Sequence, residues 1–231
     1  MLPIISAETK LSQIIIEDPS ILSVLNRFGI SLGVGDLTIE QICNKKDLNT
    51  TFFTTILNTF RDPNFFPEKT LYSFRAHLIV DYLKKTNQSY IQFQLPNIER
   101  HLSLLISKSD STGSNLLIIM NFFREVKAEL MQRIYDDDNR WFPEILALEQ
   151  QCDTVPDSPL STHGIDTQDA IEDKVNDLIS MFVIHLKGDY DMNLGQAVLL
   201  ALDSIKKDIA QNNRIRLRIL LPLYQALITN S

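Results

Sequence analysis

The sequence predicts an all-α protein in which a small N-terminal helical module precedes an antiparallel four-helix bundle. Apolar residues recur at the three- and four-residue spacing of amphipathic helices along most of the 231 residues. Prolines, glycines and capping residues interrupt that spacing at intervals that leave four short helices and then four long ones. Hydrophobic residues make up 44% of the chain, which is enough to bury a sizeable core.

The N-terminal module is predicted to occupy residues 1–62. Two short helices are expected within residues 9–28, separated near Pro19, because proline can open a helix but cannot continue one. Thr38 is expected to cap a third helix, with Gln41 completing a capping box three residues later. A fourth helix with phenylalanines on its inward face completes the module.

The four-helix bundle is predicted to occupy residues 63–231. The first long helix is expected to begin at Pro67 and to continue, kinked near Pro96, to about residue 107. The other three are expected at about residues 115–150, 167–187 and 193–229. Four long helices joined by loops are typical of an up-down bundle.

Charge and composition exclude several classes of partner. The formal charge of −7 disfavours binding to the phosphate backbone of a nucleic acid. The two cysteines, Cys43 and Cys152, form no CxxC pair, so neither a disulfide framework nor a thiol metal site is indicated. We expect no signal peptide and no membrane-spanning segment, and a cytoplasmic location.

Pairs of polar residues recur four positions apart on three of the predicted bundle helices. Residues at this spacing lie on one helix face, so each pair can point into the bundle or, alternatively, toward solvent. In two of the pairs a proline follows ten positions after the first residue. The pairs are Arg133 with Asp137, Gln168 with Glu172, and Asn212 with Arg216.

Five segments, taken in their order along the chain, carry a resemblance to a known family. They are residues 28–43, 78–90, 129–143, 171–178 and 208–222. The first is similar to the N-terminal domain of hemerythrin-like proteins of the iron–sulfur cluster repair family, in which a Cys-Cys-Gly-Gly element occupies a loop. The other four resemble the successive bundle helices of that family. The resemblance implies a hemerythrin-like four-helix bundle.

The resemblance also implies positions for the family's di-iron ligands, and most of them are changed here. The implied positions are Gln88, Arg133, Asp137, Gln168, Glu172, Asn212 and Arg216. Only Asp137 and Glu172 retain side chains that bind iron well, and two arginines bring positive charge to the place of a cation. We therefore expect no metal and no cofactor. Our hypothesis is that the seven side chains form a polar core network, with arginines paired to carboxylates.

The sequence favours a metal-free, non-catalytic hemerythrin-like protein that acts as a regulatory or interaction module. Its partner is expected to be an unidentified protein, a second copy of the chain included. One alternative is an atypical di-iron or mono-iron protein in iron–sulfur cluster repair or in the response to oxygen or nitric oxide stress. Another alternative is a small-ligand sensor that uses the remodelled bundle cavity.

Overall fold

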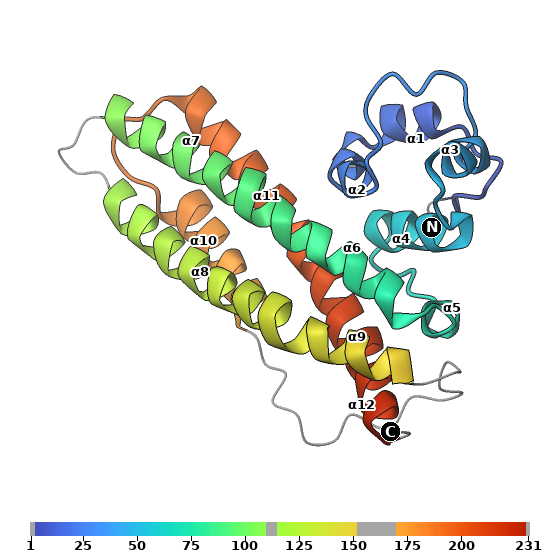
Figure 1. Ribbon diagram of the computed structural model, residues 1–231. Helices are drawn as coiled ribbons and strands as arrows, with labels where there is room; N and C mark the ends of the chain where they lie inside the picture. The colour runs from blue at the N-terminus through green and yellow to red at the C-terminus, as the bar shows by residue number, and fades with distance from the viewer. Residues whose placement is uncertain (1–2, 110–114, 152–169, 230–231) are drawn as a thin grey trace. The chain divides into compact units, whose positions relative to one another are not determined.

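The computed structural model describes residues 3–109, 115–151 and 170–229, and most of these residues are helical (Figure 1). No β-strand occurs within these ranges; an isolated antiparallel bridge joins Lys10 to Thr38. The predicted all-α fold class is therefore confirmed for the described residues. None of their helices is both long and apolar enough to cross a membrane.

The helices follow the predicted order. The N-terminal helices are α1 (Leu11–Glu17), the 3₁₀ turn η1 (Pro19–Ile21), α2 (Leu22–Arg27), α3 (Ile39–Lys46), α4 (Thr50–Arg61) and α5 (Glu68–Tyr72). The later helices are α6 (Ala76–Ser89), α7 (Leu95–Lys108), α8 (Leu116–Asp136), α9 (Phe142–Gln151), α10 (Ile171–His185), α11 (Met192–Ile215) and α12 (Leu221–Thr229). Three π-helical segments join consecutive helices: η2 (Tyr90–Gln94), η3 (Asp137–Trp141) and η4 (Arg216–Leu220).

Side-chain caps begin the short helices where the sequence predicts them. The Thr38 hydroxyl accepts a hydrogen bond from the backbone N–H of Gln41, and the Gln41 side chain accepts one from the Thr38 backbone. This is the predicted capping box. Asn49 caps α4 by accepting from the backbone N–H of Phe52 at 2.9 Å. These caps satisfy N–H groups that have no partner inside their own helix.

The first long helix does not start at Pro67, so that part of the prediction is wrong. The short helix α5 ends at Tyr72, and α6 begins anew at Ala76. Glu149 on α9 caps this new start, because its carboxylate accepts from the backbone N–H groups of Ala76 at 2.6 Å and His77 at 3.1 Å. The capping residue lies 73 positions from Ala76 along the chain, which local sequence patterns cannot indicate.

The three π-helical segments have a common cause in the sequence. Each is followed by an apolar residue and then a proline, in the pairs Leu95-Pro96, Phe142-Pro143 and Leu221-Pro222. In each case the apolar residue donates its N–H to the carbonyl five positions earlier, at Tyr90, Asp137 or Arg216. Proline has no N–H to donate and its ring crowds the preceding turn, so the chain inserts a wider turn and continues.

The chain divides into two compact units. The described residues of the first unit fall within Met1–Lys85, Ile145–His163 and Gln211–Ser231. Those of the second fall within Thr86–Glu144 and Gly164–Ala210. The predicted boundary after residue 62 thus falls inside the first unit.

The first unit is held together by an aromatic cluster and by a buried chain of hydrogen bonds. The Tyr82 ring stacks on Phe28, with ring centroids 5.7 Å apart. Its hydroxyl accepts from Arg27 Nη1 at 3.0 Å and donates to Gln211 Oε1 at 2.9 Å. Gln211 Nε2 in turn donates to the Ile56 carbonyl and to the Thr59 hydroxyl, both at 3.0 Å. These bonds connect α2, α4, α6 and α11 within the unit.

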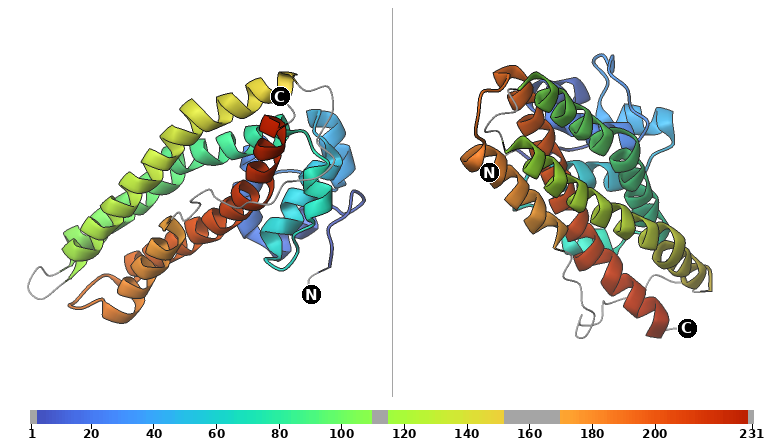
Figure 2. Two further views of the ribbon diagram at one scale, coloured as in Figure 1. Left: turned by 90° about the horizontal axis from the view of Figure 1, so that it is seen from below. Right: turned by 90° about the vertical axis from the view of Figure 1, so that its left-hand side faces the viewer.

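The second unit has one apolar core, built from α7, α8, α10 and the first part of α11. Its buried side chains include Ile98, Leu102, Leu105, Phe123, Leu130, Leu178, Phe182, Val198, Leu202 and Ile205. These four helices run alongside one another in both sets of views (Figures 1 and 2). Their apolar faces follow from the three- and four-residue spacing that the sequence predicts.

Candidate functional site

A set of polar side chains lies within the second unit, and one of them, Tyr90, is part of its apolar core. Five of its members are buried: Thr86, Asn87, Tyr90, Asp137 and Asp208. Gln94 and Asp138 are half-buried and are hydrogen-bonded to buried members. We call these seven residues the polar layer. Buried polar groups are costly unless they are hydrogen-bonded, so such a set is the natural place to look for function.

Two amide-to-carboxylate hydrogen bonds organise the polar layer. Asn87 on α6 donates through Nδ2 to Asp138 Oδ1 on η3, at 3.2 Å. Gln94 on η2 donates through Nε2 to Asp208 on α11 in a short hydrogen bond. Asp208 is completely buried and Asn87 is 1% exposed, while their partners Gln94 and Asp138 are half-buried, so both bonds are partly shielded from competing water. The α6–η2 segment therefore contributes a donor to each of two carboxylates on other helices.

The donor set of the polar layer suits hydrogen bonding better than metal binding. An amide N–H₂ that points at a carboxylate stands where a cation would otherwise bind the same oxygens. Iron sites in helical bundles need several histidine and carboxylate ligands around one position. Within residues 3–109, 115–151 and 170–229, no three histidine, cysteine, aspartate or glutamate side chains gather closely enough to hold a metal ion.

The structure places the seven predicted site residues in different surroundings. Asp137 is buried and Arg133 and Glu172 are half-buried, all three in the second unit. Asn212 and Arg216 belong to the first unit, where Asn212 is buried and Arg216 is half-buried. Neither amide atom of the Asn212 side chain has a hydrogen-bond partner among the described residues. The seventh position, Gln168, lies outside the described residues.

Gln88 is exposed, so its place in a polar core network is wrong. Helix α6 turns Thr86 and Asn87 inward, with 1% of each exposed, and the helical spacing then carries Gln88 to the outside. The buried amide at this level is Asn87, one residue earlier. An error of one residue on a helix rotates a side chain by roughly 100°.

Sequence reasoning missed several members of the polar layer, although a signal for two of them was present. Arg133 and Asp137 precede Pro143 by ten and six positions, and the same offsets counted from Pro96 give Thr86 and Tyr90. Both are buried. Asp208 and Gln94 had no such signal, because their pairing depends on how η2 and α11 approach each other.

The loop between α2 and α3 carries no thiol. Gly29, Gly33 and Gly35 all have positive φ angles there, a conformation that glycine adopts without strain. Cys43 lies further along, buried inside α3. Burial raises the pKa of the Cys43 thiol and outweighs the opposing hydrogen bond with Thr50. A buried neutral thiol is a poor nucleophile and a poor metal ligand.

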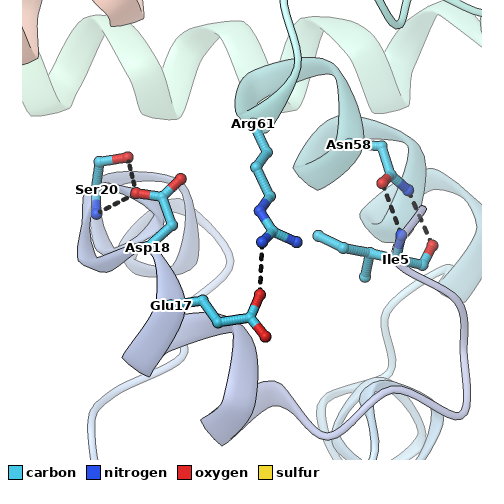
Figure 3. A network of polar contacts seen from close by, with 6 residues as sticks. All are labelled: Ile5, Glu17, Asp18, Ser20, Asn58 and Arg61. Carbon is cyan, nitrogen blue, oxygen red and sulfur yellow. Dashed lines mark hydrogen bonds and ion pairs between the residues drawn. The ribbon is translucent and has the colours of Figure 1, made fainter. Parts of the chain in front are cut away.

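A small pocket lies beside a polar network in the N-terminal part of the first unit (Figure 3). Asn58 makes two hydrogen bonds to the backbone of Ile5, at 2.8 and 2.9 Å, and Arg61 pairs with Glu17 at 2.6 Å. The pocket between residues 3–4 and the end of α4 has a volume of about 90 Å³. Typical small-molecule sites have volumes of about 300–1,000 Å³, so this pocket is too small for such a ligand.

Comparison of the chain with protein-family models, with curated proteins and with solved structures finds no match in any of the three.

Proposed function

We propose that the chain is a metal-free, non-catalytic hemerythrin-like protein that acts as an interaction or regulatory module. In this proposal α7, α8, α10 and α11 form an antiparallel four-helix bundle. Their shared apolar core supports that arrangement. So does the ion pair between Lys127 on α8 and Glu99 on α7, at 2.6 Å, which joins the middle of α8 to the first half of α7.

The observation that carries the proposal is the pairing of two of the polar layer's three carboxylates with amides. Asp138 accepts from Asn87, and Asp208 accepts from Gln94. The amides already take one oxygen of each of these carboxylates, and the rest of the polar layer offers a bound iron one further carboxylate, Asp137, and no histidine. These hydrogen bonds therefore support a structural role for the polar layer, whose side chains lack the chemistry of a metal site.

An interaction role is supported by exposed apolar side chains on the second unit. Ile118 and Ile184 are 61% and 69% exposed, on α8 and α10. Exposed apolar residues that occur singly are ordinary, whereas neighbouring ones often mark a surface that binds another protein.

Elemental analysis tests the metal-free proposal. Protein purified without chelators from cells grown with added iron is expected to contain far less than one iron per chain and to be colourless, because too few suitable ligands remain. Inductively coupled plasma mass spectrometry gives the metal-to-protein ratio. A ratio of about two irons per chain, as in di-iron bundles, would favour the alternative of an atypical iron protein in cluster repair or stress response.

A further inference from the structure

Two contacts fix how α8 and α10 are aligned. At one end, Asn115, just before α8, donates to the His185 carbonyl at 2.7 Å and accepts from the Lys187 backbone N–H at 3.0 Å. Further along, Lys174 on α10 forms an ion pair with Glu129 on α8. The start of α8 therefore lies beside the end of α10, and the two helices run antiparallel, side by side (Figure 1).

This alignment brings exposed apolar residues of the two helices together. From the Lys174–Glu129 pair, seven steps along each helix bring Met181 opposite Phe122, and ten steps on α10 and eleven on α8 then bring Ile184 near Ile118. On each helix these residues follow one another at three- or four-residue spacing, so they lie on the same side. Phe122 and Met181 are partly buried against the core, and the two isoleucines are exposed. We call these four residues the α8–α10 apolar patch.

Charged residues of opposite sign lie on either side of the patch. Asp177, three residues from Lys174, and Glu125, four residues from Glu129, are exposed toward that end and lie near each other by this alignment. Lys187 is exposed just beyond the other end of the patch. Asp177 lies five positions before Phe182, about 7–8 Å along α10, and Lys187 lies five positions after it, two residues past the end of the helix at His185. The patch thus has two exposed carboxylates, Asp177 and Glu125, near one end and the exposed Lys187 near the other, with Asp189 exposed two residues further on.

We propose that the α8–α10 apolar patch binds the same patch of a second copy of this chain, in a two-fold symmetric dimer. A two-fold axis near Phe182 reverses the direction of the second copy, which brings Lys187 of each copy to Asp177 and Glu125 of the other. The same operation packs Ile184 of one copy near Met181 of the other. Charge complementarity and apolar contact therefore support the same arrangement.

This inference rests on the proposed interaction function and names its partner. It makes no use of the metal content of the protein. A chain that is monomeric and iron-free would overturn the dimer and leave the metal-free proposal intact, and a dimer that contains iron would do the reverse.

Sedimentation velocity of the full chain tests the dimer first. At a protein concentration of about 100 µM the chain is expected to sediment with twice its mass of 26.5 kDa. Ile184→Glu is expected to sediment as a monomer, because it places a charge in the centre of the contact. Leu200→Glu is the matched control, since Leu200 is 63% exposed on α11 and lies outside the patch. It is expected to remain dimeric.

A charge exchange tests the symmetry of the contact. The double variant Asp177→Lys with Glu125→Lys, and the single variant Lys187→Asp, are each expected to weaken dimerisation at least about tenfold, because each brings like charges together. An equimolar mixture of the two variants is expected to recover the dimer, since every charge pair between the unlike copies is again opposite. A monomeric wild-type chain, a dimeric Ile184→Glu variant, or a mixture that stays monomeric would each overturn the proposal.

Discussion

Replacing Gln211 with leucine is expected to lower the free energy of unfolding by about 3–5 kcal/mol. Gln211 is 1% exposed, and its side chain makes three hydrogen bonds inside the first unit. Leucine can make none of them, so each of the three partner groups loses one bond, although Tyr82 keeps the bond from Arg27 and Thr59 keeps its bond to the Ile56 carbonyl. A lost hydrogen bond typically costs about 0.5–1.5 kcal/mol, and a buried group left unpaired about 1–3 kcal/mol. Chemical denaturation followed by circular dichroism measures the change.

Gln196→Leu is the matched control for this prediction. Gln196 lies on the same helix, α11, and is exposed, so its replacement is expected to change stability by no more than about 0.5 kcal/mol. Similar losses in both variants would show that leucine disturbs α11 generally. A loss of less than about 1 kcal/mol for Gln211→Leu would show that the buried hydrogen bonds contribute little to the first unit.

Gln94→Leu is expected to destabilise the protein by about 1.5–3 kcal/mol, the usual value of a hydrogen bond to a charged group. The replacement removes the amide that donates to Asp208, whose carboxylate is completely buried. The buried Asp208 carboxylate is stabilised by hydrogen-bond donors, because it lies in a low-dielectric setting. Loss of the Gln94 donor therefore raises the free energy of the folded state. Urea titration gives the difference in unfolding free energy.

Gln92→Leu supplies the comparison within the same π-helical segment. Gln92 is two residues from Gln94 and is exposed. The two substitutions share their intrinsic effect on the helix, so the difference between them reports on the hydrogen bond to Asp208. If the two variants unfold at the same denaturant concentration, that bond does not support the polar layer.

The helices could be predicted from the sequence because their signals are local. The capping box at Thr38 and the apolar spacing of α8, α10 and α11 each lie within a few residues of the element that they define. The start of α6 could not be predicted, since its cap is Glu149 from a distant helix. Proline signalled the disturbance near residue 96, but the sequence did not distinguish a kink from the π-helical turn observed.

The polar layer was predicted only in part, for a related reason. The spacing of four residues drew attention to Asp137, which is buried. The choice of Gln88 over Asn87 depended on the exact rotation of α6, which a resemblance between degenerate motifs does not determine. Asp208 was missed because its donor, Gln94, lies 114 positions away. Local patterns give the face of a helix, and tertiary packing decides which polar residues on that face meet.

Thermal unfolding with and without iron tests most directly the claim that the polar layer replaces a metal site. A ligand present at a hundredfold its dissociation constant stabilises the folded state by about 2.7 kcal/mol. For a chain of this size that gain raises Tm by about 5–10 °C. The account predicts the same Tm, within about 1 °C, in anaerobic ferrous iron and in EDTA. A rise in Tm that grows with iron concentration, and that Asp208→Asn abolishes, would contradict it.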